Sequence, residues 1–152
     1  MTVRTASLAV VIAFMAGSVA GLPAAQQARE YFTPRTPGDP AVTPFSGAVR
    51  ATDTLYLSGT LGLGPDRQVP ETADAEAANV LNNVRNQLDA AGMTMDDLVT
   101  VQIFSSDVAD YDAFNRVYRT YFTREFPARA FIGAGPLLFG ARFEVQGIAV
   151  KR

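Results

Sequence analysis

An apolar stripe with helical spacing between residues 72 and 91 is the feature that most constrains the fold of this 152-residue chain. Residues three and four positions apart share one face of a helix, so the segment predicts an amphipathic helix that stops at Gly92. The stripe consists of Ala77, Val80, Leu81, Val84, Leu88 and Ala91. The charged residues of the segment fall off the stripe and are expected in solvent: Glu76, Arg85 and Asp89. Such a helix must cover a second layer of structure with its apolar face.

Strand-like segments on both sides of this helix predict that second layer. They cover residues 47–50, 54–59, 98–106, 128–134 and 142–150. A second apolar stripe over residues 111–122, with Asp110 as its cap, predicts another helix. The resulting order, β-β-α-β-α-β-β, indicates an α+β fold in which a mixed sheet carries both helices on one face.

The other face of this sheet also needs a partner. In the strand over 98–106, Val99, Val101 and Ile103 are expected on one side, whereas Thr100, Gln102 and Phe104 lie on the other. A half-apolar face of this kind usually packs on another subunit, so the sequence predicts an oligomer.

The N-terminal segment is expected to be a targeting signal. Arg4 precedes an apolar run over residues 6–16, and a small-residue cleavage motif ends at Ala20. This layout predicts a signal peptide over residues 1–20, with export to the periplasm and no membrane segment in the mature protein. An uncleaved membrane anchor is the alternative. Residues 21–42 are interpreted as an extended arm, and residues 43–152 as the folded domain.

Composition excludes several kinds of chemistry. The chain has no Cys and no His, which removes thiolate nucleophiles, catalytic triads and most metal sites. Its net charge is −2, without a basic stripe, so a nucleic-acid partner is not expected. The order G-x-x-G-x-G at Gly59, Gly62 and Gly64 is not a dinucleotide motif and predicts a loop or bulge at a strand end.

Two predicted strands each carry a charge in an apolar setting. Arg129 lies on the same face of its strand as Phe131, and Glu144 on the same face as Arg142. One interpretation is a structural ion pair, in which Glu144 binds either arginine. The other is a site in which the planar guanidinium binds a carboxylate with two hydrogen bonds while Glu144 moves protons or orients water.

Four stretches of the sequence together resemble the RidA/YjgF family of reactive-imine deaminases. They are "TPFSGAVRATDTLYLSGTLGLG", "NVLNNVRNQLDAAGMTMDDLVTVQIFSSDVADYDAFNRVYRTYF", "FPARAF" and "FEVQGIAVKR". The resemblance covers about residues 43–152 and implies a chorismate-mutase-like fold, in a homotrimer with ligand pockets between subunits. It also implies hydrolysis of 2-imino acids to 2-keto acids and ammonia, without a metal or cofactor.

The same resemblance assigns roles to individual residues. Arg129 matches the arginine that holds the substrate carboxylate, and Glu144 matches the glutamate that positions or activates water. Ser58 and Asn115 match a serine and an asparagine of the pocket. Ser58 has the alternative role of ending a strand, and Asn115 of capping or bridging backbone.

Two residues depart from the family pattern and put the exact substrate in doubt. Phe45 stands where the family often has Tyr, and its ring cannot donate a hydrogen bond. Phe131 stands where the family often has Cys or another small residue, which suggests a narrower pocket. A non-catalytic protein that binds a small carboxylate is therefore the alternative. A chaperone-like or RNA-cleaving role, proposed for some relatives, is disfavoured by the acidic composition and the lack of His.

Overall fold

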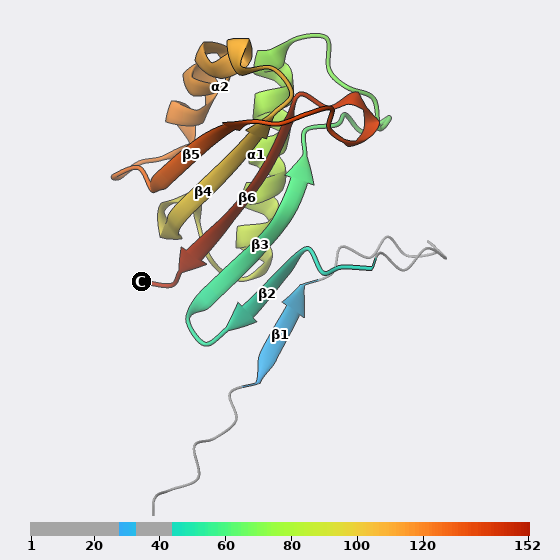
Figure 1. Ribbon diagram of the computed structural model, residues 1–152. Coiled ribbons are helices and arrows are strands. Elements are labelled where there is room, and N and C mark those ends of the chain that lie inside the picture. The colour runs from blue at the N-terminus through green and yellow to red at the C-terminus, as the bar shows by residue number, and fades with distance from the viewer. Residues whose placement is uncertain (1–27, 33–43) are drawn as a thin grey trace, which may run out of the picture.

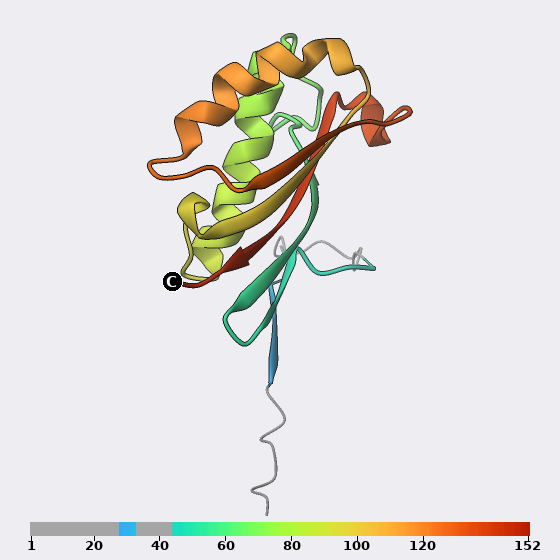
Figure 2. The ribbon, with the colours of Figure 1, turned by 60° about the vertical axis from the view of Figure 1, so that its left-hand side comes forward.

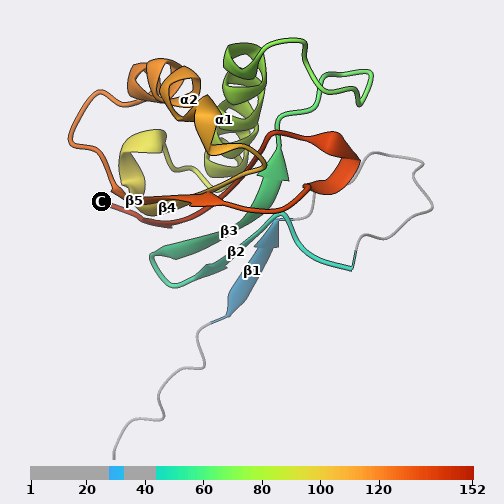
Figure 3. The same ribbon diagram turned by 45° about the horizontal axis from the view of Figure 1, so that its top comes forward.

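The computed structural model describes residues 28–32 and 44–152, which form one six-stranded sheet covered by two helices (Figure 1). The strands are β1 Arg29–Phe32, β2 Ala48–Ala51, β3 Thr54–Leu61, β4 Leu98–Ser105, β5 Ala128–Gly133 and β6 Phe143–Val150. The helices are α1 Ala73–Ala90 and α2 Tyr111–Tyr118, and short 3-10 turns lie between several elements. Both helices lie on the same side of the sheet (Figures 2 and 3).

The order of strands in the sheet is β1-β2-β3-β6-β4-β5. Every neighbouring pair is antiparallel except β4 and β5, which are parallel and are connected through α2. The α+β prediction, with a mixed sheet and two helices on one face, is therefore confirmed. Helix α1 packs across β3 and β6 and against α2, and this arrangement forms the core.

The sequence did not predict β1. It lies within residues 21–42, which were interpreted as an extended arm, and it pairs with β2 at the edge of the sheet. The Arg50 side chain on β2 binds Glu30 on β1 and donates to the carbonyl of Ala91 at 2.9 Å. The predicted signal peptide lies outside the described residues. In the part of the chain that is described, no helix combines the length and the apolar character that a membrane span requires.

Helix α1 follows the predicted stripe with one exception. The Thr72 hydroxyl caps its first turn by accepting from the Ala75 amide at 3.2 Å, and Gly92 ends it in the left-handed region at φ 67°. The residues of the stripe are all buried. The exception is Glu76, which was expected in solvent and is 0% exposed. A fully buried carboxylate requires partners, which are described below.

Helix α2 differs from the prediction at both ends. Asp110 makes no side-chain cap, whereas the Asp107 carboxylate accepts from the Ala109 amide at 2.9 Å and starts the preceding 3-10 turn. The regular helix ends at Tyr118, and a 3-10 turn over Arg119–Tyr121 completes the predicted segment. Phe114 and Tyr118 are buried against the sheet side of the core, as the second stripe predicts.

The prediction that Val99 shares the buried face of β4 was wrong, because a bulge lies at this position. The register of β4 against β6 shifts between Leu98 and Thr100, which leaves Val99 exposed and buries Leu98 in its place. Val101 and Ile103 are buried under the helices as expected. The face that carries Thr100, Gln102 and Phe104 is not covered by either helix of the described chain, in agreement with the predicted division of this strand.

Candidate active site

Arg129 lies in a cage of neutral side chains from α2. Its Nη1 donates to the Asn115 Oδ1 at 2.7 Å, and its Nη2 lies 3.5 Å from the Tyr111 hydroxyl oxygen. The guanidinium carbon lies 4.8 Å from the ring centroid of Tyr118 and 5.7 Å from that of Tyr111. Aromatic faces and an amide oxygen orient the cation without neutralising its charge.

The ion-pair interpretation of Arg129 is wrong. Within residues 28–32 and 44–152 the ion pairs are Arg50–Glu30, Arg116–Asp74 and Arg142–Glu76. Arg129 belongs to none of these pairs, and Arg142 binds Glu76 instead of Glu144. Arg129 instead lines a pocket of about 220 Å³ together with Tyr111, Asn115, Tyr118, Arg119, Phe126 and Pro127, here called the clamp pocket. The uncompensated guanidinium is thus available to bind an anion that enters this pocket.

Phe131 contributes to the support of this pocket. It lies on the same face of β5 as Arg129, since Val101 and Ile103 pair with these two residues. Its ring makes edge contacts with Tyr111 at 5.1 Å and with Phe114 at 5.8 Å between centroids. The ring therefore packs under α2 and buttresses Tyr111.

Tyr118 is the most perturbed titratable group of the clamp pocket. Its side chain is buried, and within the described structure its hydroxyl has no hydrogen-bond partner. Burial raises the pKa of Tyr118 to about 12, although the positive charge of Arg129 acts in the opposite direction. The neutral phenol is therefore favoured in the folded protein.

Replacing Tyr118 by phenylalanine is expected to change the alkaline stability profile. The folded state binds the phenolic proton more tightly than the unfolded state, so wild-type stability falls as the pH rises from about 10 to about 12. The Tyr118→Phe variant would lack this contribution, and urea unfolding should show a flatter dependence between pH 9 and about 12. The matched control is Tyr56→Phe, because Tyr56 is 50% exposed. Parallel curves for wild type and Tyr118→Phe would contradict the raised pKa of Tyr118.

Glu144 lies in a second pocket, which the strands share with Gln87 of α1. This acid pocket, of about 450 Å³, is lined by Phe45, Gly47, Ser58, Gly59, Thr60, Leu61, Gln87, Leu138, Phe139 and Glu144. The predicted bulge is present, since the register of β3 against β6 shifts between Leu57 and Thr60. Gly59 sits at this bulge, and a Cβ atom there would lie 2.0 Å from the Glu144 Oε1. Glycine therefore lets the carboxylate lie directly against the backbone of β3.

Ser58 and Phe45 complete the predicted residues of the acid pocket. The Ser58 hydroxyl donates to the carbonyl of Ser46 at 2.6 Å, and its amide donates to the carbonyl of Gly47 at 2.9 Å. These bonds fix the chain that carries Phe45, whose side chain is 57% exposed. The Ser58 oxygen keeps a lone pair with which it can accept a hydrogen bond from a ligand.

The predicted site residues thus divide between the two pockets. Arg129 pairs with Val101, and Glu144 pairs with Phe104, three positions further along β4. Residues that pair across strands share a face, so Arg129 points to the helix side and Glu144 to the uncovered side. A single chain consequently presents the cation and the acid on different faces of one sheet.

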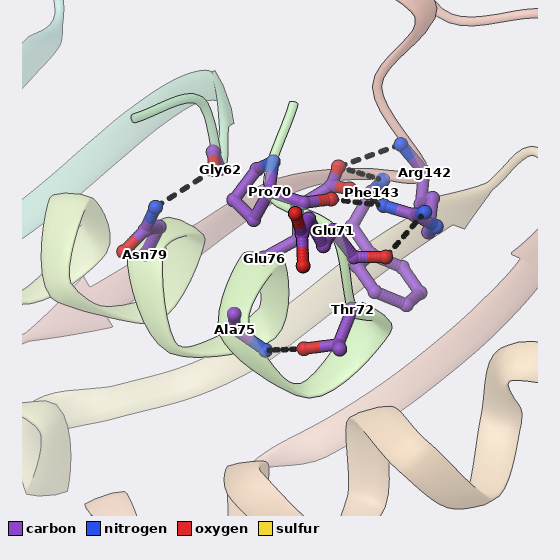
Figure 4. A network of polar contacts seen from close by, with 9 residues as sticks. All are labelled: Gly62, Pro70, Glu71, Thr72, Ala75, Glu76, Asn79, Arg142 and Phe143. Carbon is purple, nitrogen blue, oxygen red and sulfur yellow. Dashed lines mark hydrogen bonds and ion pairs between the residues drawn. The ribbon is translucent and has the colours of Figure 1, made fainter. Parts of the chain in front are cut away.

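The sequence analysis missed the network around Glu76 (Figure 4). The Glu76 Oε1 accepts from the amides of Arg142 at 2.6 Å and of Phe143 at 3.0 Å, and its Oε2 accepts from the Arg142 Nη1 at 3.0 Å. The Arg142 guanidinium also donates to the carbonyls of Pro70 at 2.8 Å and Glu71 at 3.1 Å. Glu76 lies four residues before Val80 and eight before Val84, so it shares their face of the helix. This spacing could have predicted from the sequence that Glu76 is buried.

Comparison with known proteins places the chain in a family. The model of the family described as Endoribonuclease L-PSP matches residues 36–151. A 2-iminobutanoate/2-iminopropanoate deaminase of Capra hircus is 38% identical over 113 residues, which are 73% of this chain and 82% of the relative.

Solved structures agree with this match. RidA of an Antarctic Psychrobacter species has 31% identity and a TM-score of 0.68, over 72% of this chain and 90% of that one. Escherichia coli TdcF with bound serine has 25% identity and a TM-score of 0.69, over 74% and 91%. The chain therefore belongs to the Endoribonuclease L-PSP family, which is the RidA/YjgF family that its motifs resemble.

Proposed function

We propose that the chain is an imine deaminase that hydrolyses 2-imino acids to 2-keto acids and ammonia. The observation that carries this proposal is the guanidinium of Arg129, which is held by Asn115 and two tyrosine rings and is not paired with a carboxylate among the described residues. The curated relatives named as deaminases, at 36–38% identity in goat, mouse and cow, support the same reaction.

The side chains suit a simple reaction sequence. Arg129 binds the α-carboxylate of the substrate and fixes the position of the imine carbon. Glu144 accepts a hydrogen bond from water and orients its oxygen toward that carbon. The water oxygen adds to the imine carbon while one water proton passes through the carboxylate to the imine nitrogen, which gives a carbinolamine. The same carboxylate then carries the hydroxyl proton to the amino group, the C–N bond breaks, and ammonia and the 2-keto acid are released with the carboxylate again ionised.

We propose further that the two pockets meet in a homotrimer, where Glu144 of one subunit faces Arg129 of the next. The opposite orientation of the two residues supports this arrangement, because one sheet face cannot present both. The uncovered sheet face, which includes Tyr56, Thr100 and Ile148 along a groove of about 380 Å³, is suited to subunit packing. The serine bound to TdcF supports the proposed ligand, because serine has the same α-carboxylate as a 2-imino acid.

Trapping of the imine tests the reaction. An amino-acid oxidase produces the 2-imino acid, and semicarbazide captures it as a semicarbazone that absorbs in the ultraviolet. Addition of the purified protein should lower the rate of semicarbazone formation, because the imine is hydrolysed before capture. No change with any 2-imino acid, together with measurable binding of a small carboxylate, would favour the binding protein, for which Phe45 in the acid pocket is the supporting observation.

RNA cleavage, to which the name of the family refers, has less support. The chain has a net charge of −2, which does not favour binding of a polyanion, and it has no His to act as an acid or base. We also propose export through the signal peptide over residues 1–20, on the sequence pattern alone.

Replacing Gly59 by alanine is expected to lower deaminase activity with little effect on folding. The new Cβ would lie 2.0 Å from the Glu144 Oε1, so the carboxylate must rotate away from its position over β3. A displacement of about 1 Å at a reacting group lowers the rate by up to about 100-fold, and we expect a loss of about 10- to 100-fold in kcat. The control is Gly135→Ala, because a Cβ atom at Gly135 would meet nothing within 4 Å. Wild-type kcat in Gly59→Ala would refute the proposed role of the Glu144 position.

A further inference from the structure

Two large apolar side chains that are mostly exposed in the described structure line the same pocket as Glu144. Leu138 and Phe139, here called the apolar wall, belong to the 3-10 turn between β5 and β6, and they are 69% and 65% exposed. Both line the acid pocket, where Phe45 and Leu61 add further apolar surface. Exposed apolar surface that adjoins a polar reactive group is typical of a ligand pocket.

The backbone of the apolar wall holds Phe139 in an uncommon conformation. Its φ and ψ are 58° and 16°, in the left-handed region that bulky residues rarely adopt, and Gly140 follows at φ 74°. The Arg67 guanidinium carbon lies 5.7 Å from the centroid of the Phe139 ring. The backbone conformation and the contact with Arg67 together favour the position of the ring at the pocket.

On the basis of the proposed deaminase function, we propose that the apolar wall selects 2-imino acids with a large apolar side chain. In the proposed trimer, a substrate whose α-carboxylate is held by Arg129 of one subunit and whose imine carbon faces Glu144 of the next lies at the acid pocket, and we infer that its side chain enters this pocket. The pocket volume of about 450 Å³ exceeds what a small substituent fills, and the wall offers it no hydrogen-bonding group from its side chains. Binding energy therefore comes from burial of apolar surface.

The size of the preference follows from the apolar transfer energy. Each methylene that is buried changes an equilibrium constant by about fourfold. The substrate derived from leucine has three more carbons than that derived from alanine. We expect its kcat/KM to exceed that of the alanine-derived substrate by at least about tenfold, because the wall covers only part of the added surface.

The test compares this ratio between wild type and wall variants. The double variant Leu138→Ala/Phe139→Asn removes the wall, and Asn tolerates the left-handed backbone better than other residues of its size. We expect its leucine-to-alanine ratio to fall to within about threefold of one. Arg67→Gln, which frees the ring, should give an intermediate ratio. The control is Val150→Ala, at the far end of β6, which should keep the wild-type ratio.

Two further measurements separate the possible outcomes. A wild-type ratio near one, or an unchanged ratio in the double variant, would overturn the inference while leaving the deaminase function intact. Loss of the oligomeric mass in the double variant would also overturn it, because the wall would then be a subunit contact.

Calorimetry with 4-methyl-2-oxopentanoate and pyruvate tests selection without catalysis. Tighter binding of the larger keto acid, lost in the double variant, would support the apolar wall even if no imine were hydrolysed. Equal binding of the two keto acids by wild type would count against it.

Discussion

Replacement of Arg129 by alanine is expected to lower kcat/KM for imine hydrolysis by at least about 100-fold. A hydrogen bond to a charged group contributes about 1.5–3 kcal/mol, and the planar guanidinium can form two of them with a substrate carboxylate. The sum corresponds to two or more powers of ten in rate. Arg129→Lys keeps the charge but loses the bidentate geometry, and it should retain an intermediate activity. Semicarbazone trapping measures both variants.

Arg116→Ala is the matched control for this experiment. Arg116 lies on the same helix as Asn115 and forms an exposed ion pair with Asp74 at 3.0 Å, away from the clamp pocket. Its removal should leave kcat/KM within about twofold of wild type. If Arg129→Ala were fully active, Arg129 would not be the carboxylate clamp, and the proposed site would have to be abandoned.

Replacement of Glu76 by alanine is expected to cause the largest loss of stability, about 3–5 kcal/mol in the free energy of unfolding. The substitution leaves the amides of Arg142 and Phe143 without their acceptor and removes the anion that balances the Arg142 guanidinium. Glu76→Gln keeps the shape and one acceptor oxygen, but its side-chain amide NH2 would face an N–H donor of Arg142 or Phe143, and a smaller loss of about 1–3 kcal/mol is expected. Urea unfolding measures the change as a shift in midpoint.

The control for Glu76 is an acid on the same helix that is exposed. Asp74→Ala breaks the ion pair with Arg116 and should change the free energy of unfolding by less than about 1 kcal/mol. Equal losses in the free energy of unfolding for Glu76→Ala and Asp74→Ala would show that the buried Glu76 carboxylate does not stabilise the fold. Because Glu76 binds the start of β6, its variants should also lower activity through Glu144, two residues beyond Arg142.

Periodicity predicted the elements whose burial is regular. The stripe of α1 from Ala77 to Leu88 and the division of β4 at Val101 and Ile103 both depend on repeated burial, which sequence displays directly. Local exceptions were not predictable in this way. The bulge that exposes Val99 depends on the register of a distant strand, and a buried Glu76 depends on amides 66 and 67 positions away.

The sequence selected candidate residues for the site, but their division between the two faces of the sheet needed the structure. Motifs identified Arg129, Asn115, Ser58 and Glu144 one by one, since each falls in a recognisable stretch. The faces on which they lie follow from strand pairing, which joins β4 to both β5 and β6. The apolar wall depends on a left-handed Phe139 backbone, for which the sequence carries no signal apart from the neighbouring Gly140.

The placement of Arg129 and Glu144 on opposite faces of the sheet has a consequence for how activity arises. On the proposed assembly, a correctly folded monomer is inactive, and turnover requires association with other copies of the chain. Two damaged chains, one lacking the cation and the other lacking the acid, could restore each other when they assemble together. Catalytic activity would then depend on the contact between copies, and dilution that dissociates the copies would abolish this activity.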